Sequence, residues 1–155
     1  MSEHKATLHW QQSDGKFREG KFSRDHTWTF DGGVTVPASA SPLAVRVPLS
    51  NPDCVDPEEA FVASIASCHM LTFLYLAQKR GYDIESYDDQ AVGVMTKNAQ
   101  RISWVSSVEL SPRIQFRGDR VPSRQELEAL HADAHHECFI ANSVKSEIRV
   151  NILGE

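Results

Sequence analysis

Two cysteines lie where thiol chemistry is possible. Cys68 stands in the middle of a long apolar run, and Cys138 follows a second stretch with a helical pattern. A thiol that a peroxide oxidises to a sulfenic acid can be resolved by a second thiol, which condenses with it to a disulfide. That role requires a cation beside the first thiol and a second cysteine within disulfide reach. Free cysteine is also among the most buried residue types, so simple packing is the alternative for Cys68.

A metal-binding site is an alternative to the redox pair of cysteines and belongs to another class of function. His131 and His135 are four residues apart on one predicted helix face, and His136, Cys138 and His69 could add ligands for zinc. Against this hypothesis, the chain contains neither an H-E-x-x-H nor a C-x-x-C motif, and amphipathic helices often carry surface histidines. The zinc-binding protein is therefore the weaker hypothesis. The third cysteine, Cys54, lies in a polar loop and is expected to be a bystander.

A long central helix over residues 56–81 must position Cys68. Asp56 and Glu59 form a capping box around Pro57, which suits the first helical position, and Gly81 supplies the stop. The helix is apolar on nearly every side, so we expect it to be buried. Its apolar run, residues 61–76, is interpreted as too short and too interrupted by polar residues to span a bilayer.

The remaining elements predict an α+β fold. A second helix begins with a capping box at Ser123 and Glu126 and ends near His136, just before Cys138. Because consecutive strands lack intervening helices, the order is not that of a doubly wound sheet. Turn residues at 13–15 and 31–33 separate the first strands. Alternating patterns predict strands at residues 4–12, 21–30, 34–36, 86–96, 101–116 and 144–153, with a short one possible at 43–47.

Composition limits the classes of function. The 155 residues, 41% apolar and 24% charged, predict one soluble domain over residues 1–155. A net charge of −5 argues against nucleic acid as a partner, since phosphate binding needs a basic face. An odd number of cysteines, three, and no N-terminal signal pattern predict a cytoplasmic protein.

The sequence also resembles a known family. The segment DPEEAFVASIASC, the later pattern C-x-x-x-N-S-x-x-x-E-I and an N-terminal β-hairpin with an arginine are similar to those of the OsmC/Ohr family. Members of this family are peroxide reductases, named for osmotic induction and organic hydroperoxide resistance. The resemblance implies an OsmC-like fold with antiparallel sheets around the central helix.

The resemblance also implies roles for individual residues. Cys68 matches the peroxidatic cysteine, and Cys138 matches the resolving cysteine. Arg24 matches the arginine that the Ohr branch uses to hold the thiolate and orient the peroxide. The OsmC branch takes its arginine from the segment where Arg46 stands, and Arg18 is a third candidate. No metal or organic cofactor is implied.

The resemblance implies an assembly as well. Glu58 matches the family's glutamate, which would hold Arg24 in a charge-assisted pair. Glu58 and Cys68 are ten residues apart, about 15 Å along a straight helix, so they cannot touch within one helix. The resemblance favours an intertwined homodimer with active sites at the interface. An organic hydroperoxide would be the substrate and a dithiol the reductant. The alternative within this family is a non-catalytic protein whose thiols are merely buried.

Overall fold

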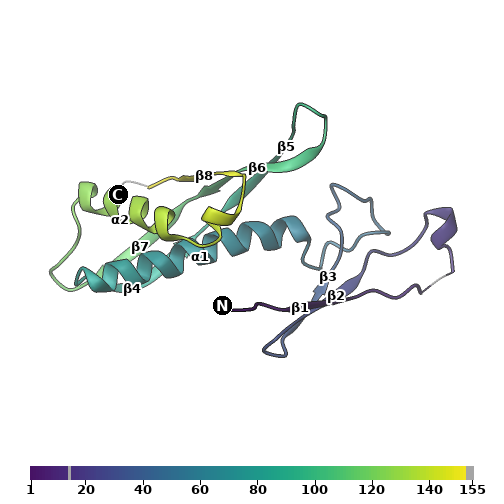
Figure 1. Cartoon of the computed structure of the whole chain (residues 1–155), viewed down its shortest axis with the longest axis horizontal. Helices are drawn as coiled ribbons and strands as arrows, with labels where there is room; N and C mark the ends of the chain where they lie inside the picture. Colours follow the sequence, from purple (N-terminus) through teal and green to yellow (C-terminus); the bar gives the residue numbers. More distant parts are fainter. Residues whose placement is uncertain (14, 153–155) are drawn as a thin grey trace. The chain divides into compact units, whose positions relative to one another are not determined.

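The structure, a computed structural model, describes residues 1–13 and 15–152 (Figure 1). Asp14 of the predicted first turn and Leu153 of the predicted last strand lie outside them. The chain divides into two compact units, Met1–Ala60 and Phe61–Glu155. The fold class is α+β, as predicted, and the extent of the single domain stays a prediction.

The N-terminal unit contains one antiparallel sheet with the order β1-β2-β3. Its elements are β1 (Ala6–His9), η1 (Phe17–Glu19), β2 (His26–Phe30) and β3 (Thr35–Ala38). The alternating pattern of residues 4–12 is typical of a half-buried strand, but all four residues of β1 are exposed, and Leu8 is 66% exposed. One face of a sheet is buried only when a second layer packs on it, and most of this unit lies outside helices and strands. The segment 43–47 forms turns instead of a strand.

Helix α1 (Pro57–Lys79) begins and ends as the sequence predicts. The Glu59 amide donates to Asp56 Oδ1 at 2.8 Å, and the Asp56 amide donates to Glu59 Oε2 at 3.1 Å, which completes the capping box. Gly81 has a φ of +77°, the left-handed conformation that ends a helix.

The predicted burial of α1 is only partly correct. A single stripe is buried, with residues one turn apart: Ile65, His69, Phe73 and Ala77. Leu71 is 60% exposed and Tyr75 is 52% exposed. By length and composition alone the whole helix could cross a membrane, and the interpretation that its apolar run, residues 61–76, does not span a bilayer stays a prediction. Core helices of globular domains meet the same criterion.

The C-terminal unit holds the remaining elements, two sheets and two helical segments. The sheets have the orders β4-β7 and β5-β6-β8, with β6 and β8 parallel. The elements that follow α1 are β4 (Asp83–Asp89), β5 (Val92–Lys97), β6 (Ser103–Leu110), β7 (Pro112–Arg117), α2 (Arg124–Glu137), η2 (Ala141–Ser143) and β8 (Glu147–Val150).

Two strands predicted as continuous are each divided between the two sheets. The strand at 86–96 breaks after Asp89, and the strand at 101–116 breaks at Ser111. The two breaks face each other, since the Ser111 amide donates to Asp89 Oδ1 at 2.7 Å. The two predicted strands therefore bend at neighbouring positions, at Asp89 and at Ser111. Such bends let paired strands pass from one sheet to another.

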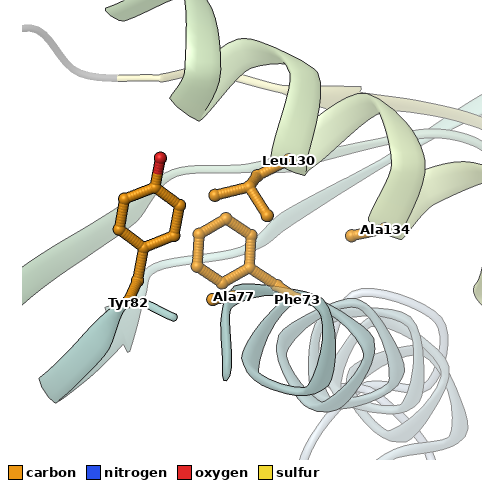
Figure 2. Close-up of a cluster of buried hydrophobic side chains, with 5 residues drawn as sticks. All are labelled: Phe73, Ala77, Tyr82, Leu130 and Ala134. Carbon is orange, nitrogen blue, oxygen red and sulfur yellow. The ribbon is translucent and has the colours of Figure 1, made fainter. Parts of the chain in front are cut away.

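Two apolar clusters hold the helices of this unit in place. Figure 2 shows the first, in which Phe73 of α1 faces Leu130 of α2 and the Tyr82 ring lies beside them. The second lies where α1 meets the β5-β6-β8 sheet and is centred on Ile65, Val108 and Leu110. Together they fix α1 between α2 and both sheets.

Gly93 of β5 marks the closest approach of a strand to α1. A Cβ at this position would lie 2.5 Å from Val62 Cγ2. Valine has one strongly preferred rotamer in a helix, so this methyl group cannot turn away. We expect Gly93→Ala to lower the free energy of unfolding by about 2 kcal/mol, the usual cost of overpacking.

Chemical denaturation measures this loss, and Val62→Ala supplies the matched control. The double variant Gly93→Ala/Val62→Ala should be more stable than the sum of the two single losses predicts, because the small residue removes the clash. If the losses of the two single variants simply add in the double variant, the contact between Gly93 and Val62 is not the cause of the destabilisation in Gly93→Ala.

Candidate active site

Cys68 lies on α1 with its side chain half-buried. The amide of Ile140, from the segment between α2 and η2, donates to the Cys68 sulfur at 3.5 Å. A backbone N–H aimed at sulfur stabilises negative charge on it, and the thiolate is the nucleophilic form of cysteine. Cys68 is therefore only partly buried and receives a backbone hydrogen bond, and its reactivity stays a prediction.

Cys138 is the C-cap residue of α2 and is fully buried. Its sulfur accepts a hydrogen bond from the Ala141 amide at 3.4 Å. Burial, followed by the hydrogen bond with the neighbouring Cys68 thiol, raises the pKa of Cys138 to about 11. At neutral pH Cys138 is therefore a protonated thiol in contact with Cys68.

The motif around Cys138 holds this cysteine in place. The side-chain amide of Asn142 donates to the carbonyl oxygens of His136 at 2.8 Å and Cys138 at 2.9 Å, which closes the end of α2. The Ser143 hydroxyl donates to the Phe139 carbonyl at 2.8 Å. The C-x-x-x-N-S pattern in the sequence is thus a capping device that fixes the direction of the second thiol.

The two helices are also joined by a buried pair of histidines. His69 Nε2 lies 3.0 Å from His131 Nδ1, and the stacked rings have centroids 5.3 Å apart. Burial lowers the pKa of His69 to about 4 and that of His131 to about 3, with the neighbouring histidines adding to both effects. Both rings are therefore neutral at physiological pH. The sequence pattern did not predict this contact between His69 and His131.

The structure does not assemble the alternative zinc site. His131 is buried against His69, whereas His135 and His136 are exposed. Among residues 1–13 and 15–152, no group of three or more His, Cys, Asp or Glu side chains is arranged to hold a metal ion. His131 and His135 both lie on α2, but His131 Nδ1 is already engaged by His69 Nε2.

Arg24 lies in the N-terminal unit, just before β2. Its guanidinium carbon is 3.7 Å from the centre of the Phe22 ring, and its Nη1 donates to the Phe22 carbonyl oxygen. Glu58 is half-buried in the first turn of α1, which continues without a break to Cys68 and beyond. Among the described residues of one chain, no ion pair joins Arg24 to Glu58, and their pairing stays a prediction.

The other arginine candidates occupy turns of the same unit. Arg46 is exposed, and its carbonyl accepts from the Leu49 amide at 3.0 Å. Arg18 is exposed within η1. Cys54 is half-buried in a loop of this unit, where burial, with Asp25 second, raises the pKa of its thiol. A raised pKa keeps a thiol unreactive, which suits the bystander that the sequence predicts.

Comparison with known proteins shows close similarity to one family. Residues 50–153 match the family described as OsmC-like protein. The solved structure of an OsmC-like protein of unknown function from Vibrio cholerae O1 biovar eltor is 50% identical. That match covers 99% of this chain and 100% of that one, with a TM-score of 0.96.

More distant structures share the fold. An organic hydroperoxide resistance protein from Elizabethkingia anophelis is 17% identical, with 97% of this chain and 93% of that one covered and a TM-score of 0.71. The organic hydroperoxide resistance protein OhrB of Bacillus subtilis is 16% identical, with 97% and 98% covered and a TM-score of 0.65. None of the curated proteins matches the chain.

Proposed function

Because this chain belongs to the OsmC-like protein family, we propose that it is a thiol-dependent peroxidase that reduces organic hydroperoxides to alcohols. One observation carries the proposal: Cys68 and Cys138 are free thiols in contact with each other, the first half-buried and the second buried. Two proteins of the same fold are named for organic hydroperoxide resistance, which supports the choice of substrate.

The first step oxidises Cys68. Its thiolate attacks the terminal oxygen of R–O–O–H, so that an S–O bond forms, the O–O bond breaks and the alkoxide leaves with a proton as the alcohol. The sulfur loses two electrons to the peroxide and becomes a sulfenic acid. The Ile140 amide supports the attacking charge, since it donates to the Cys68 sulfur.

The second step uses Cys138. Its sulfur attacks the sulfenic sulfur of Cys68, the S–S bond forms, and the S–O bond breaks. The hydroxyl leaves as water with the proton of the Cys138 thiol, which is present because the pKa of this thiol is raised. A dithiol, small or carried by a protein, then reduces the disulfide by thiol exchange and is itself oxidised to a disulfide.

Arg24 and Glu58 complete the proposed site, with Arg24 stabilising the Cys68 thiolate and Glu58 of a second copy holding the guanidinium. The exposed stripe of α1 supports a homodimer. Ser67, Leu71 and Tyr75 are exposed one turn apart on α1, and Leu71 and Tyr75 are 60% and 52% exposed. The exposed apolar side chains of Leu71 and Tyr75 favour contact with another apolar surface.

Peptide mapping by mass spectrometry tests the function. After one equivalent of cumene hydroperoxide, we expect a peptide pair joined by a Cys68–Cys138 disulfide, with Cys54 still reduced. The same treatment of Cys68→Ser should leave Cys138 reduced. If both thiols of the wild-type protein stay reduced in excess hydroperoxide, the peroxidase is excluded and Cys68 is a packing residue.

A further inference from the structure

A chain of hydrogen bonds ends on the backbone of Arg24. The indole Nε1 of Trp28 donates to His26 Nε2 at 2.8 Å, and His26 Nδ1 lies 2.7 Å from the Arg24 carbonyl oxygen. An indole N–H can only donate and a carbonyl can only accept. His26 must therefore be the neutral tautomer with its proton on Nδ1, and both of its ring nitrogens are used.

The backbone amide of Arg24 also makes a hydrogen bond. The Arg24 amide donates to the Leu49 carbonyl at 2.9 Å. The next residue, Asp25, accepts at 2.9 Å from the hydroxyl of Ser39, which is fully buried. Both peptide groups that flank the Arg24 side chain are thus tied to other parts of the N-terminal unit, on a segment outside any strand.

We infer that His26 and Trp28 are positioning residues that fix the backbone of Arg24, so that its guanidinium is presented from a rigid base. The inference rests on the proposed function, in which Arg24 serves the Cys68 thiolate. A charged group held in one place loses little conformational freedom when it meets the reacting atoms, and such preorganisation raises the rate. Trp28 does not contact Arg24 in this chain of hydrogen bonds. Its indole donates to His26 Nε2 and so favours the His26 tautomer that donates from Nδ1 to the Arg24 carbonyl.

Two substitutions of His26 separate positioning from mere packing. The amide nitrogen of asparagine can take the place of Nδ1, so His26→Asn keeps a donor to Arg24. The longer side chain of glutamine reaches the place of Nε2, so His26→Gln keeps an acceptor for Trp28 and loses the bond to Arg24. We expect kcat/KM for cumene hydroperoxide to fall about tenfold in His26→Gln and about twofold or less in His26→Asn.

Hydrogen exchange gives a readout that does not depend on activity. The Arg24 amide should be protected in the wild type and in His26→Asn, and should exchange at least about tenfold faster in His26→Gln. Nitrogen NMR of the wild type should show a proton on His26 Nδ1 and none on Nε2. In Trp28→Phe, which removes the indole donor, this preference for one tautomer should weaken.

The outcomes distinguish this inference from the proposed function. Equal kcat/KM and equal exchange in His26→Asn and His26→Gln would overturn the inference, even with a fully active peroxidase. The opposite tautomer of His26 would overturn it too. If the wild type does not react with hydroperoxide, the proposed function fails, while the exchange and NMR results still decide whether His26 holds Arg24. If Arg24→Lys reacts as fast as the wild type, the role of Arg24 is lost and the inference with it.

Discussion

Replacing Cys138 by serine should change the product of the first equivalent of peroxide when no other thiol is present, from the Cys68–Cys138 disulfide of the wild type to a Cys68 sulfenic acid. Cys138 neighbours Cys68, and in the proposed mechanism it supplies both the attacking sulfur and the departing proton. In Cys138→Ser the Cys68 sulfenic acid has no thiol to condense with. It should therefore accumulate and, in excess peroxide, advance to the sulfinic acid. Stoichiometric titration with a sulfenic-acid trap and intact mass measures the result.

Replacing the other cysteine of the pair, Cys68, should give a different result. Cys68→Ser should consume no peroxide above the background of a free thiol, because Cys138 is buried and its raised pKa keeps it protonated. Cys54→Ser is the matched control, since Cys54 lies in the other unit, and it should keep full turnover. If Cys138→Ser forms a disulfide between Cys68 and Cys54 on treatment with peroxide while Cys54→Ser forms no disulfide, Cys54 is the resolving residue.

The different surroundings of the two thiols explain the assigned order of events. Cys68 is half-buried and receives a backbone hydrogen bond, whereas Cys138 is sealed at the end of α2. In the proposed mechanism, peroxide reacts first with the more exposed sulfur, and the buried thiol takes part in the second step. A symmetric pair would allow either cysteine to be overoxidised, which the proposed division of roles avoids.

Local signals predicted the helices well. Both capping boxes form where the sequence places them, at Asp56 with Glu59 and at Ser123 with Glu126. Capping depends on residues within one turn, so the sequence carries the whole signal. The corner between Asp89 and Ser111 was not predicted, because alternation continues through it and only the pairing of distant strands reveals the change of sheet.

The site shows the same contrast between local and non-local information. Cys68 and Cys138 were identified by motif, and the structure brings them together because α1 and α2 pack side by side. The Ile140 amide was not predicted, since a backbone donor leaves no trace in residue type. The contact of His69 with His131 joins residues 62 positions apart, and neither residue type required the other.

The histidine pair leads to the second large effect, a loss of stability in mild acid. Both rings are buried, at 1% and 2% exposure, and share one hydrogen bond. The remaining nitrogens, His69 Nδ1 and His131 Nε2, have no partner in the part of the chain that the structure describes. A proton on either ring would place a charge in an apolar layer next to Phe73.

The sign of the effect follows from the two pKa values. In the folded protein the pKa of His69 is about 4 and that of His131 about 3, below the ordinary value of 6.5 expected in the unfolded chain. Between pH 6.5 and 4 the unfolded chain therefore binds up to two more protons, so unfolding becomes more favourable as the pH falls. From pH 7 to 5 each histidine should lower the free energy of unfolding by about 2 kcal/mol.

Substitutions that keep the hydrogen bond and remove the titration test this explanation. In the double variant His69→Gln/His131→Asn the side-chain amides can reproduce the bond between Nε2 and Nδ1 and bind no proton. Denaturant unfolding at pH 7 and pH 5 should show a loss of about 4 kcal/mol in the wild type and about 1 kcal/mol or less in the double variant. His4→Gln, at an exposed position outside every strand, should lose as much as the wild type. A double variant with the wild-type pH dependence would show that groups other than His69 and His131 bind the protons. Protonation of this histidine pair would then not be what destabilises the contact between the two helices in acid.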